Sequence, residues 1–342
     1  MKSIANMFIS DSLSYCHDIL PRVSRTFAIG INALSGNLKK SVLVGYLLCR
    51  IADTIEDDKS LSVDEKILHF NHFLACFKTP HCIKEFPQIY ARLNGDPWHI
   101  DLVKNTQHVF FVYQELSSHT KKNLEKWVTE MVDGMAMFTS RFPKGIRVYS
   151  LAEYKEYCYY VAGTVGFLLS ELWLEYSWFI GKKTYAKLNF YAGVFGEALQ
   201  TVNILKDISW DFHKENSIYL PLEELKKFGS SHENMFHEEN IKQSDIVAKK
   251  FLDLAHTNLE KAKEYVLSLP RFSFRIRYFC ILPLILAYAT LRELKQSSSL
   301  LSPNSIVKIS RREVKELASS SLMASVSNTY LKKLIEKVQF PS

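Results

Sequence analysis

The sequence predicts a protein built from α-helices alone. Helix breakers are scarce, because 12 Gly and 10 Pro residues are spread over 342 positions, about half of the roughly 12% that is usual for the two together. Apolar residues also recur at helical spacing along almost the whole chain. No segment alternates like a strand, and no internal repeat or interdomain linker is apparent. We therefore expect one all-α domain over residues 1–342, with a core of about 11–317.

The first half of the chain is expected to form helices around one broken connection. The helix over 38–57 is marked by apolar residues every four positions, at Leu43, Leu47, Ile51 and Ile55. Three prolines and a glycine interrupt residues 79–98, so we expect an irregular connection there. The helices predicted in this half span residues 11–20, 23–34, 38–57, 63–77, 102–116 and 119–138.

The second half continues with helical periodicity and ends in a helix over 311–338. Two polar segments, at 229–243 and at 295–305 with its serine run, are expected to be loops. The helices predicted in this half span residues 151–174, 183–208, 244–268, 279–294 and 311–338.

Composition limits the location and the partners. The net charge of +7 suits anionic partners such as diphosphates or an acidic membrane surface, and we expect no nucleic-acid partner. Six scattered cysteines without a C-x-x-C pair favour reduced cytosolic thiols over disulfides or zinc. The N-terminus shows no signal peptide. The most apolar stretch, residues 281–291, is shorter than the roughly 20 residues needed to span a bilayer, so a cytoplasmic protein without a transmembrane segment is expected.

A first carboxylate cluster lies at the end of the predicted helix 38–57. Asp53, Glu56 and Asp57 share one helix face, where like charges cost roughly 0.2–0.5 kcal/mol per pair. A divalent cation such as Mg²⁺, which bridges carboxylates to substrate phosphates, would offset this repulsion. Arg50, one turn earlier, could pair with the carboxylates and reach a diphosphate.

A second cluster lies about 150 residues later, on the predicted helix 183–208 and just beyond it. Gln200, Asn203, Asp207 and Asp211 form one polar stripe on an otherwise apolar helix. A lone acidic run is usually a solvated helix face. Two such runs, each aligned with an Arg or an Asn, favour metal binding over that alternative.

Four stretches of the sequence together resemble the squalene/phytoene synthase family, whose members join two prenyl diphosphates head to head. The resemblance runs from about Tyr15 to Leu222 and more weakly to Leu317. It implies the isoprenoid synthase fold, a helical bundle around a central cavity with two facing Asp-rich helices. The four stretches are residues 24–27 (Ser-Arg-Thr-Phe), 50–58, 157–166 and 196–211.

The resemblance implies roles for individual residues. Those implied to bind Mg²⁺ are Asp53, Glu56, Asp57, Asn203, Asp207 and Asp211. Those implied to bind the prenyl diphosphate, with farnesyl diphosphate expected, are Ser24, Arg25, Arg50, Gln200 and Lys206. Tyr46 and Tyr160 would act near the reacting carbons, beside the catalytic carboxylates Asp53, Asp57, Asp207 and Asp211.

The resemblance also bears on the product. Squalene synthases finish with a hydride from NADPH, whereas phytoene and dehydrosqualene synthases lose a proton. The C-terminal third resembles the squalene type, in which Phe279 would lie near the nicotinamide while Lys308 and Arg311 would hold cofactor phosphates. Residues 218–221 are closer to the phytoene branch. We expect condensation of two farnesyl diphosphates through presqualene diphosphate and then reduction to squalene.

Two positions depart from the family pattern. Trp210 stands where an acidic residue is usual, and Lys206 stands where Arg is usual, which keeps the charge but loses the two-pronged geometry. Eukaryotic squalene synthases carry a C-terminal membrane anchor, and none is expected here, although peripheral membrane contact would suit a lipid substrate. The alternatives are a phytoene or dehydrosqualene synthase, a terpene cyclase or prenyl diphosphate phosphatase, and a non-enzymatic assembly factor of the same fold.

Overall fold

The computed structural model describes residues 2–302 and 307–340, apart from the side chains of residues 2–9 and 25. Within these residues the chain is helical and has no β-strand, in agreement with the predicted all-α class. A single parallel bridge pairs Arg147 with Ile218. The chain divides into two compact units, one of residues 1–141 and 171–176 and the other of residues 142–170 and 177–342.

The first unit is organised around α3, which packs against α1, α2, α4, α6, α7 and α8. The side chains of Leu43, Leu47, Ile51 and Ile55 are fully buried, so the four-residue spacing does mark the core face of this helix. The helices of the unit are α1 (Lys2–Val23), α2 (Arg25–Ala33), α3 (Gly36–Asp57), α4 (Val63–Ala75), α5 (Pro80–Glu85), the 3₁₀-helix η1 (Phe86–Arg92), α6 (Pro97–Lys104), α7 (Thr106–Gln114) and α8 (Ser118–Arg141).

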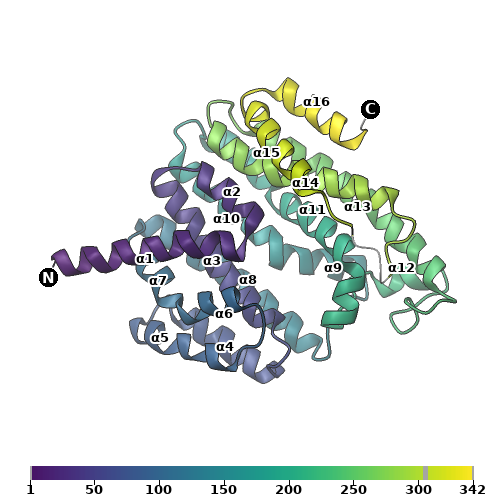
Figure 1. Cartoon of the computed structure of the whole chain (residues 1–342), viewed down its shortest axis with the longest axis horizontal. Helices are drawn as coiled ribbons and strands as arrows, with labels where there is room; N and C mark the ends of the chain where they lie inside the picture. Colours follow the sequence, from purple (N-terminus) through teal and green to yellow (C-terminus); the bar gives the residue numbers. More distant parts are fainter. Residues whose placement is uncertain (1, 303–306, 341–342) are drawn as a thin grey trace. The chain divides into compact units, whose positions relative to one another are not determined.

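The second unit is built on the long helix α11, which packs against α9, the π-helix η2, α13 and α14. The neighbouring helices α13, α14 and α15 pack against one another in sequence order (Figure 1). The helices from this part of the chain are α9 (Leu151–Cys158), η2 (Tyr159–Gly163), α10 (Thr164–Tyr176), α11 (Lys182–Glu215), α12 (Leu222–Lys226), α13 (Ile241–Ser268), α14 (Phe274–Gln296), α15 (Arg311–Val326) and α16 (Asn328–Gln339).

Several boundaries differ from the periodicity-based expectation for local reasons. The predicted helix 311–338 is two helices, because Ser327 is extended and caps α16 through the Tyr330 amide. The predicted helix 102–116 is divided at Asn105 between α6 and α7. The proline-rich segment 79–98 forms short helices rather than an irregular connection, since its prolines stand at helix starts, where their missing N–H costs nothing.

Helix α14 has a length and apolar composition that would also suit a membrane span. The apolar run at residues 281–291, considered alone, is too short to indicate this. In the structure, 72% of its most apolar window is buried. The helix thereby supplies core side chains of the second unit, such as Tyr288 and Leu284, neither of which is exposed.

Candidate active site

The C-terminal half of α3 carries the first candidate group, centred on Arg50. Its Nη1 lies 3.3 Å from Oδ2 of Asp53, one turn further on. Its Nη2 donates to the Tyr46 hydroxyl at 3.1 Å, and that hydroxyl donates to the carbonyl oxygen of Val23 at 3.3 Å. The Phe27 ring packs 5.6 Å from the Tyr46 ring. These contacts fix Tyr46, Arg50 and Asp53 relative to the end of α1 and the start of α2.

Burial and close opposite charges act together on the titratable groups of this cluster. Burial raises the pKa of the Asp53 carboxyl, and the nearby Arg50 guanidinium only partly opposes this shift. Burial would lower the pKa of Arg50, but the charges of Asp53 and Asp57 and the hydrogen bond to Tyr46 raise it above its usual value. Among the described residues, the buried Nε of Arg50 has no hydrogen-bond acceptor. One donor of this guanidinium is therefore left unused by the contacts of the described residues.

The position of the carboxylates at the end of α3 is also electrostatically unfavourable. The helix ends at Asp57, so Glu56 and Asp57 lie in its last turn, which contains no basic residue. The C-terminal end of a helix carries partial negative charge, and anionic side chains there are unfavourable. A cation bound to these carboxylates would offset this unfavourable interaction with the helix end.

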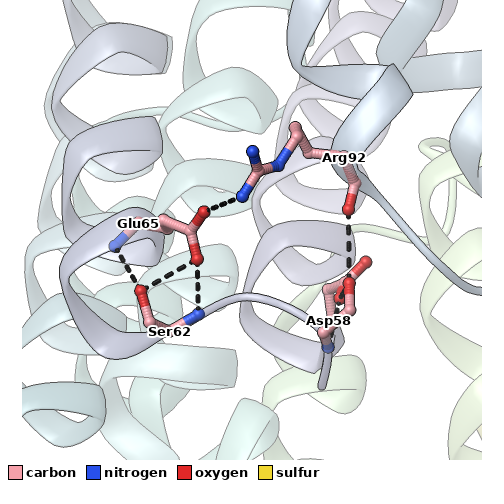
Figure 2. A network of polar contacts seen from close by, with 5 residues as sticks. Asp58, Ser62, Glu65 and Arg92 are labelled. Atoms are coloured by element: carbon pink, nitrogen blue, oxygen red, sulfur yellow. Dashed lines mark hydrogen bonds and ion pairs between the residues drawn. The ribbon is translucent and has the colours of Figure 1, made fainter.

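Asp58, the last acid of the same run, has a structural role instead. It is buried, and its Oδ1 accepts hydrogen bonds from the amide and hydroxyl of Ser60 while its Oδ2 accepts one from the Asn94 amide. The neighbouring capping box of Ser62 and Glu65 starts α4, and Arg92 pairs with Glu65 (Figure 2). This network fixes the chain immediately after the candidate ligands.

The two predicted phosphate-binding residues before α3 differ in what can be described. Ser24 caps α2, because its hydroxyl oxygen accepts a hydrogen bond from the Phe27 amide at 3.2 Å. A helix N-terminus with free N–H groups suits an anion. The side chain of Arg25 lies outside the described part of the structure.

Helix α11, in the second unit, carries the second candidate group. Nζ of Lys206 lies 3.0 Å from Oδ2 of Asp207, and both side chains are partly exposed. Asn203 is exposed, whereas Gln200 and Asp211 are half-buried. Trp210, which departs from the family pattern, is 55% exposed, so this ring takes no part in the core.

Several polar side chains pack on the inner side of α11, and the sequence analysis did not identify them. The Tyr154 hydroxyl donates to Oγ1 of Thr201 at 2.9 Å, and Nδ2 of Asn258 donates to Oε1 of Glu197 at 2.8 Å. Burial raises the pKa of Tyr154 well above its usual value. Glu197 lies within the 196–211 motif, but only its contact with a helix 60 residues later reveals its partner.

Tyr160 lies on the π-helix η2, a feature that periodicity did not predict. Insertions of this kind are common at functional sites, because one extra residue changes the direction of the side chains that follow. The helix is held close to α11 by glycines. A Cβ on Gly196 would lie 2.2 Å from the carbonyl oxygen of Ala162, and one on Gly166 would lie 2.1 Å from that of Ala192. Close packing against α11 is therefore the physical reason for a glycine at position 166.

The residues proposed for NADPH occupy different environments in the second unit. Phe279 belongs to α14 and is only 4% exposed. Lys308 precedes α15 and Arg311 is its first residue, and both are exposed. The exposed side chains of Lys308 and Arg311 suit the phosphates of a cofactor. The Phe279 ring, in contrast, is part of the helical core.

No group of three or more His, Cys, Asp or Glu side chains in the described residues is close enough to hold a metal ion by itself. Magnesium is typically bound by one or two carboxylates together with substrate phosphates. The oxygen donors of Asp53 on α3, and of Asp207 on α11 beside Lys206, fit that pattern. The structure describes the two groups in separate units.

Comparisons with known proteins find relatives over most of the chain. The chain is 30% identical to squalene synthase 1 of Arabidopsis thaliana, over 81% of this chain and 64% of the relative. It is 26% identical to squalene synthase of Schizosaccharomyces pombe, over 95% of this chain and 68% of the relative. The chain thus spans about two-thirds of the length of these relatives.

The fold of the chain is also similar to that of a solved structure. A solved complex of a protein named TcSQS with the ligand BPH1237 superposes with a TM-score of 0.79 at 24% identity, covering 96% of this chain and 91% of that one. The family model described as "Squalene/phytoene synthase" matches residues 20–313, which is most of the sequence. The chain belongs to the squalene/phytoene synthase family.

Proposed function

We propose that this protein is a prenyltransferase that condenses two farnesyl diphosphates head to head through presqualene diphosphate and forms squalene. The observation that carries the proposal is the group on α3. There, Asp53 has a pKa raised by burial although it is paired with Arg50. A half-buried carboxylate of this kind is stabilised by a further cation, and a diphosphate–cation complex would supply it.

The proposed metal ligands are the carboxylates and the amide on the two acidic helices. These residues are Asp53, Glu56, Asp57, Asn203, Asp207 and Asp211. When bound, Mg²⁺ would neutralise charge that develops on a departing diphosphate. Arg50 and Lys206 would bind and orient diphosphate oxygens by charge-assisted hydrogen bonds, and Ser24, Arg25 and Gln200 would complete these contacts.

We further propose that the two acidic helices face each other across the substrate, within a single domain. In that arrangement Tyr46 and Tyr160 would lie near the reacting carbons. Tyr46 is already oriented by its bonds to Arg50 and Val23, so its ring can stabilise a nearby cation through its face. The apolar surroundings would exclude water, which would otherwise capture a carbocation.

The choice of squalene over dehydrosqualene or phytoene is supported by the curated relatives, which are squalene synthases. Lys308 and Arg311 are exposed cations that suit NADPH phosphates, whereas the burial of Phe279 does not suit a nicotinamide contact as placed. The prenyl substrate and the product are lipids, so we propose a cytoplasmic protein with peripheral membrane contact.

Product analysis tests this proposal. Purified protein is incubated with farnesyl diphosphate and Mg²⁺, with and without NADPH, and the products are identified by mass spectrometry. Squalene that forms only with NADPH supports the proposal. A conjugated triene formed regardless of NADPH indicates a dehydrosqualene or phytoene synthase. A monomeric terpenoid indicates a cyclase or phosphatase, and the absence of any product favours the assembly factor.

A further inference from the structure

Two neighbouring turns of the second unit place large aromatic side chains in solvent. Trp178 is fully exposed and Phe179 is 55% exposed in the turn between α10 and α11, while Phe272 is 76% exposed in the turn between α13 and α14. The rings of Phe179 and Phe272 lie 5.5 Å apart. The two turns therefore form one continuous aromatic surface rather than isolated exposed residues.

Both turns are held firmly, so this exposure is a property of the folded chain. The hydroxyls of Ser177 and Ser273 are joined by a hydrogen bond of 3.0 Å. The guanidinium of Arg277, which is fully buried, donates to the carbonyl oxygens of Val266 and Leu269, near the end of α13. A cation on the last carbonyl groups of a helix stabilises its C-terminus, and here it fixes the turn that presents Phe272.

The same buried arginine also binds a third segment, at the end of α15. Nε of Arg277 donates to the carbonyl oxygen of Ser325 at 2.7 Å, and its Nη2 donates to Oδ1 of Asn328 at 2.6 Å. The end of α15 is thereby held beside the turn after α13. Val326, next to Ser325, is 52% exposed and adds an apolar side chain at this end of the unit.

The charged residues in and directly after the two turns are all basic. Lys182 and Lys183 follow the first turn and Arg271 lies in the second, and all three are exposed. Residues 177–196 and 265–292 contain no Asp or Glu. We name the surface formed by Trp178, Phe179, Phe272, Lys182, Lys183 and Arg271 the aromatic–basic patch.

We propose that the aromatic–basic patch docks this protein on an anionic lipid bilayer. Tryptophan and phenylalanine insert at the boundary between headgroups and acyl chains, where their rings are more stable than in water. Lysine and arginine beside them are attracted by the negative surface potential of anionic lipids. Because neither segment contains an acidic residue, no carboxylate within them is repelled by the anionic lipids.

This inference gives the peripheral membrane contact of the proposed function a location, and it rests on that function only for its biological reason. Its test is co-sedimentation with phosphatidylcholine vesicles, with and without phosphatidylserine. We expect binding that requires phosphatidylserine and weakens as salt is added, because the Debye length shortens. Trp178→Ala should lower the partition coefficient about tenfold, and Lys182→Glu/Lys183→Glu should lower it at least about 25-fold.

A matched charge control is available at the other end of α13. Lys226 of α12 and Lys242 at the start of α13 are exposed, and the segment directly after α12 contacts the first half of α13 through Ser230 and Phe228. The 28 residues of α13 separate them from the patch by about 40 Å. Lys226→Glu/Lys242→Glu changes the net charge equally and should bind vesicles almost as well as the wild type.

The results separate docking from its alternatives. Equal loss for the patch and control variants would reduce the effect to net charge and overturn the inference, as would the absence of vesicle binding by the wild type. Self-association that is abolished by Trp178→Ala, without vesicle binding, would instead assign the patch to a second copy of the chain. Patch-dependent vesicle binding by a protein that forms no prenyl product would leave the inference standing while the proposed function fails.

Discussion

A Cβ atom built on Gly166 of α10 would lie 2.1 Å from the carbonyl oxygen of Ala192 on α11. Neither partner can move by a rotamer change, since the oxygen belongs to the backbone. This contact keeps the segment that carries Tyr160 close to the helix that carries Asp207. Glycine at this position is thus explained by packing between helices.

The first prediction concerns this contact. Gly166→Ala should lower the free energy of unfolding by roughly 3 kcal/mol, because overpacking against backbone forces the helices apart. Chemical denaturation monitored by circular dichroism measures the loss. Gly95→Ala is the control, since a Cβ there meets no atom within 4 Å. Equal stability of the two variants would contradict the packing argument.

The second prediction separates two adjacent acids. Asp58→Asn should destabilise the protein by about 1–3 kcal/mol, because one of its buried acceptor oxygens becomes an N–H donor that faces another donor. Asp57→Asn, at an exposed position in the last turn of α3, should leave stability within about 0.5 kcal/mol and instead remove activity. Thermal melting and product formation are measured on both variants. Reversed results would exchange the proposed roles.

A third prediction follows from the buried Tyr288 of the second unit and its partly exposed partner Glu260. Burial raises the pKa of Glu260, but hydrogen bonds from Lys263 and Tyr288 outweigh burial, so the pKa lies below its usual 4.5. Tyr288 donates to Oε1 of Glu260 at 2.7 Å. Tyr288→Phe should therefore cost about 1–2 kcal/mol near neutral pH.

The pH dependence of that cost has a definite sign. A carboxyl whose pKa is lowered in the folded state contributes stability above its usual pKa, and this contribution is lost as the pH falls through the folded-state value. The difference between the wild type and Tyr288→Phe should thus be constant above pH 4.5 and shrink below it. Urea titrations across this range measure it, and a difference independent of pH would argue against an ionised Glu260 as the acceptor.

The fourth prediction concerns Lys206, whose Nζ lies 3.0 Å from Oδ2 of Asp207. Lys206→Met should raise KM for farnesyl diphosphate about ten- to a hundredfold, because a charge-assisted hydrogen bond is lost. Lys206→Arg keeps the charge and adds a second donor, so it should retain activity. Steady-state kinetics separate the two. An unchanged KM in Lys206→Met would remove this residue from the proposed diphosphate contacts.

Helices with a clear apolar period could be predicted well from the sequence. Residues 63–77 and 244–268 correspond to α4 (Val63–Ala75) and α13 (Ile241–Ser268). Such helices depend mainly on which residues are apolar and how they are spaced. The clusters on α3 and α11 were also identifiable, because carboxylates repeated on one face of an apolar helix are unfavourable without a partner.

Features that depend on tertiary contacts could not be predicted. The π-helix around Tyr160 and the break at Ser327 preserve the apolar pattern, so periodicity alone runs through both. The bond of Glu197 with Asn258 joins positions on two separate helices. The partners of Asp58 lie in two separate loops, Ser60 before α4 and Asn94 before α6, and only the folded chain distinguishes this acid from Asp53 and Asp57.

We propose that carboxylates on α3 and α11 together hold a metal through which diphosphate leaves a prenyl chain. The most direct measurement is pyrophosphate release from farnesyl diphosphate as Mg²⁺ is varied, in the wild type and in Asp53→Asn and Asp207→Asn. We predict Mg²⁺-dependent release by the wild type, with at least about a hundredfold loss in each variant at unchanged thermal stability. Release at the wild-type rate by either variant would contradict the claim.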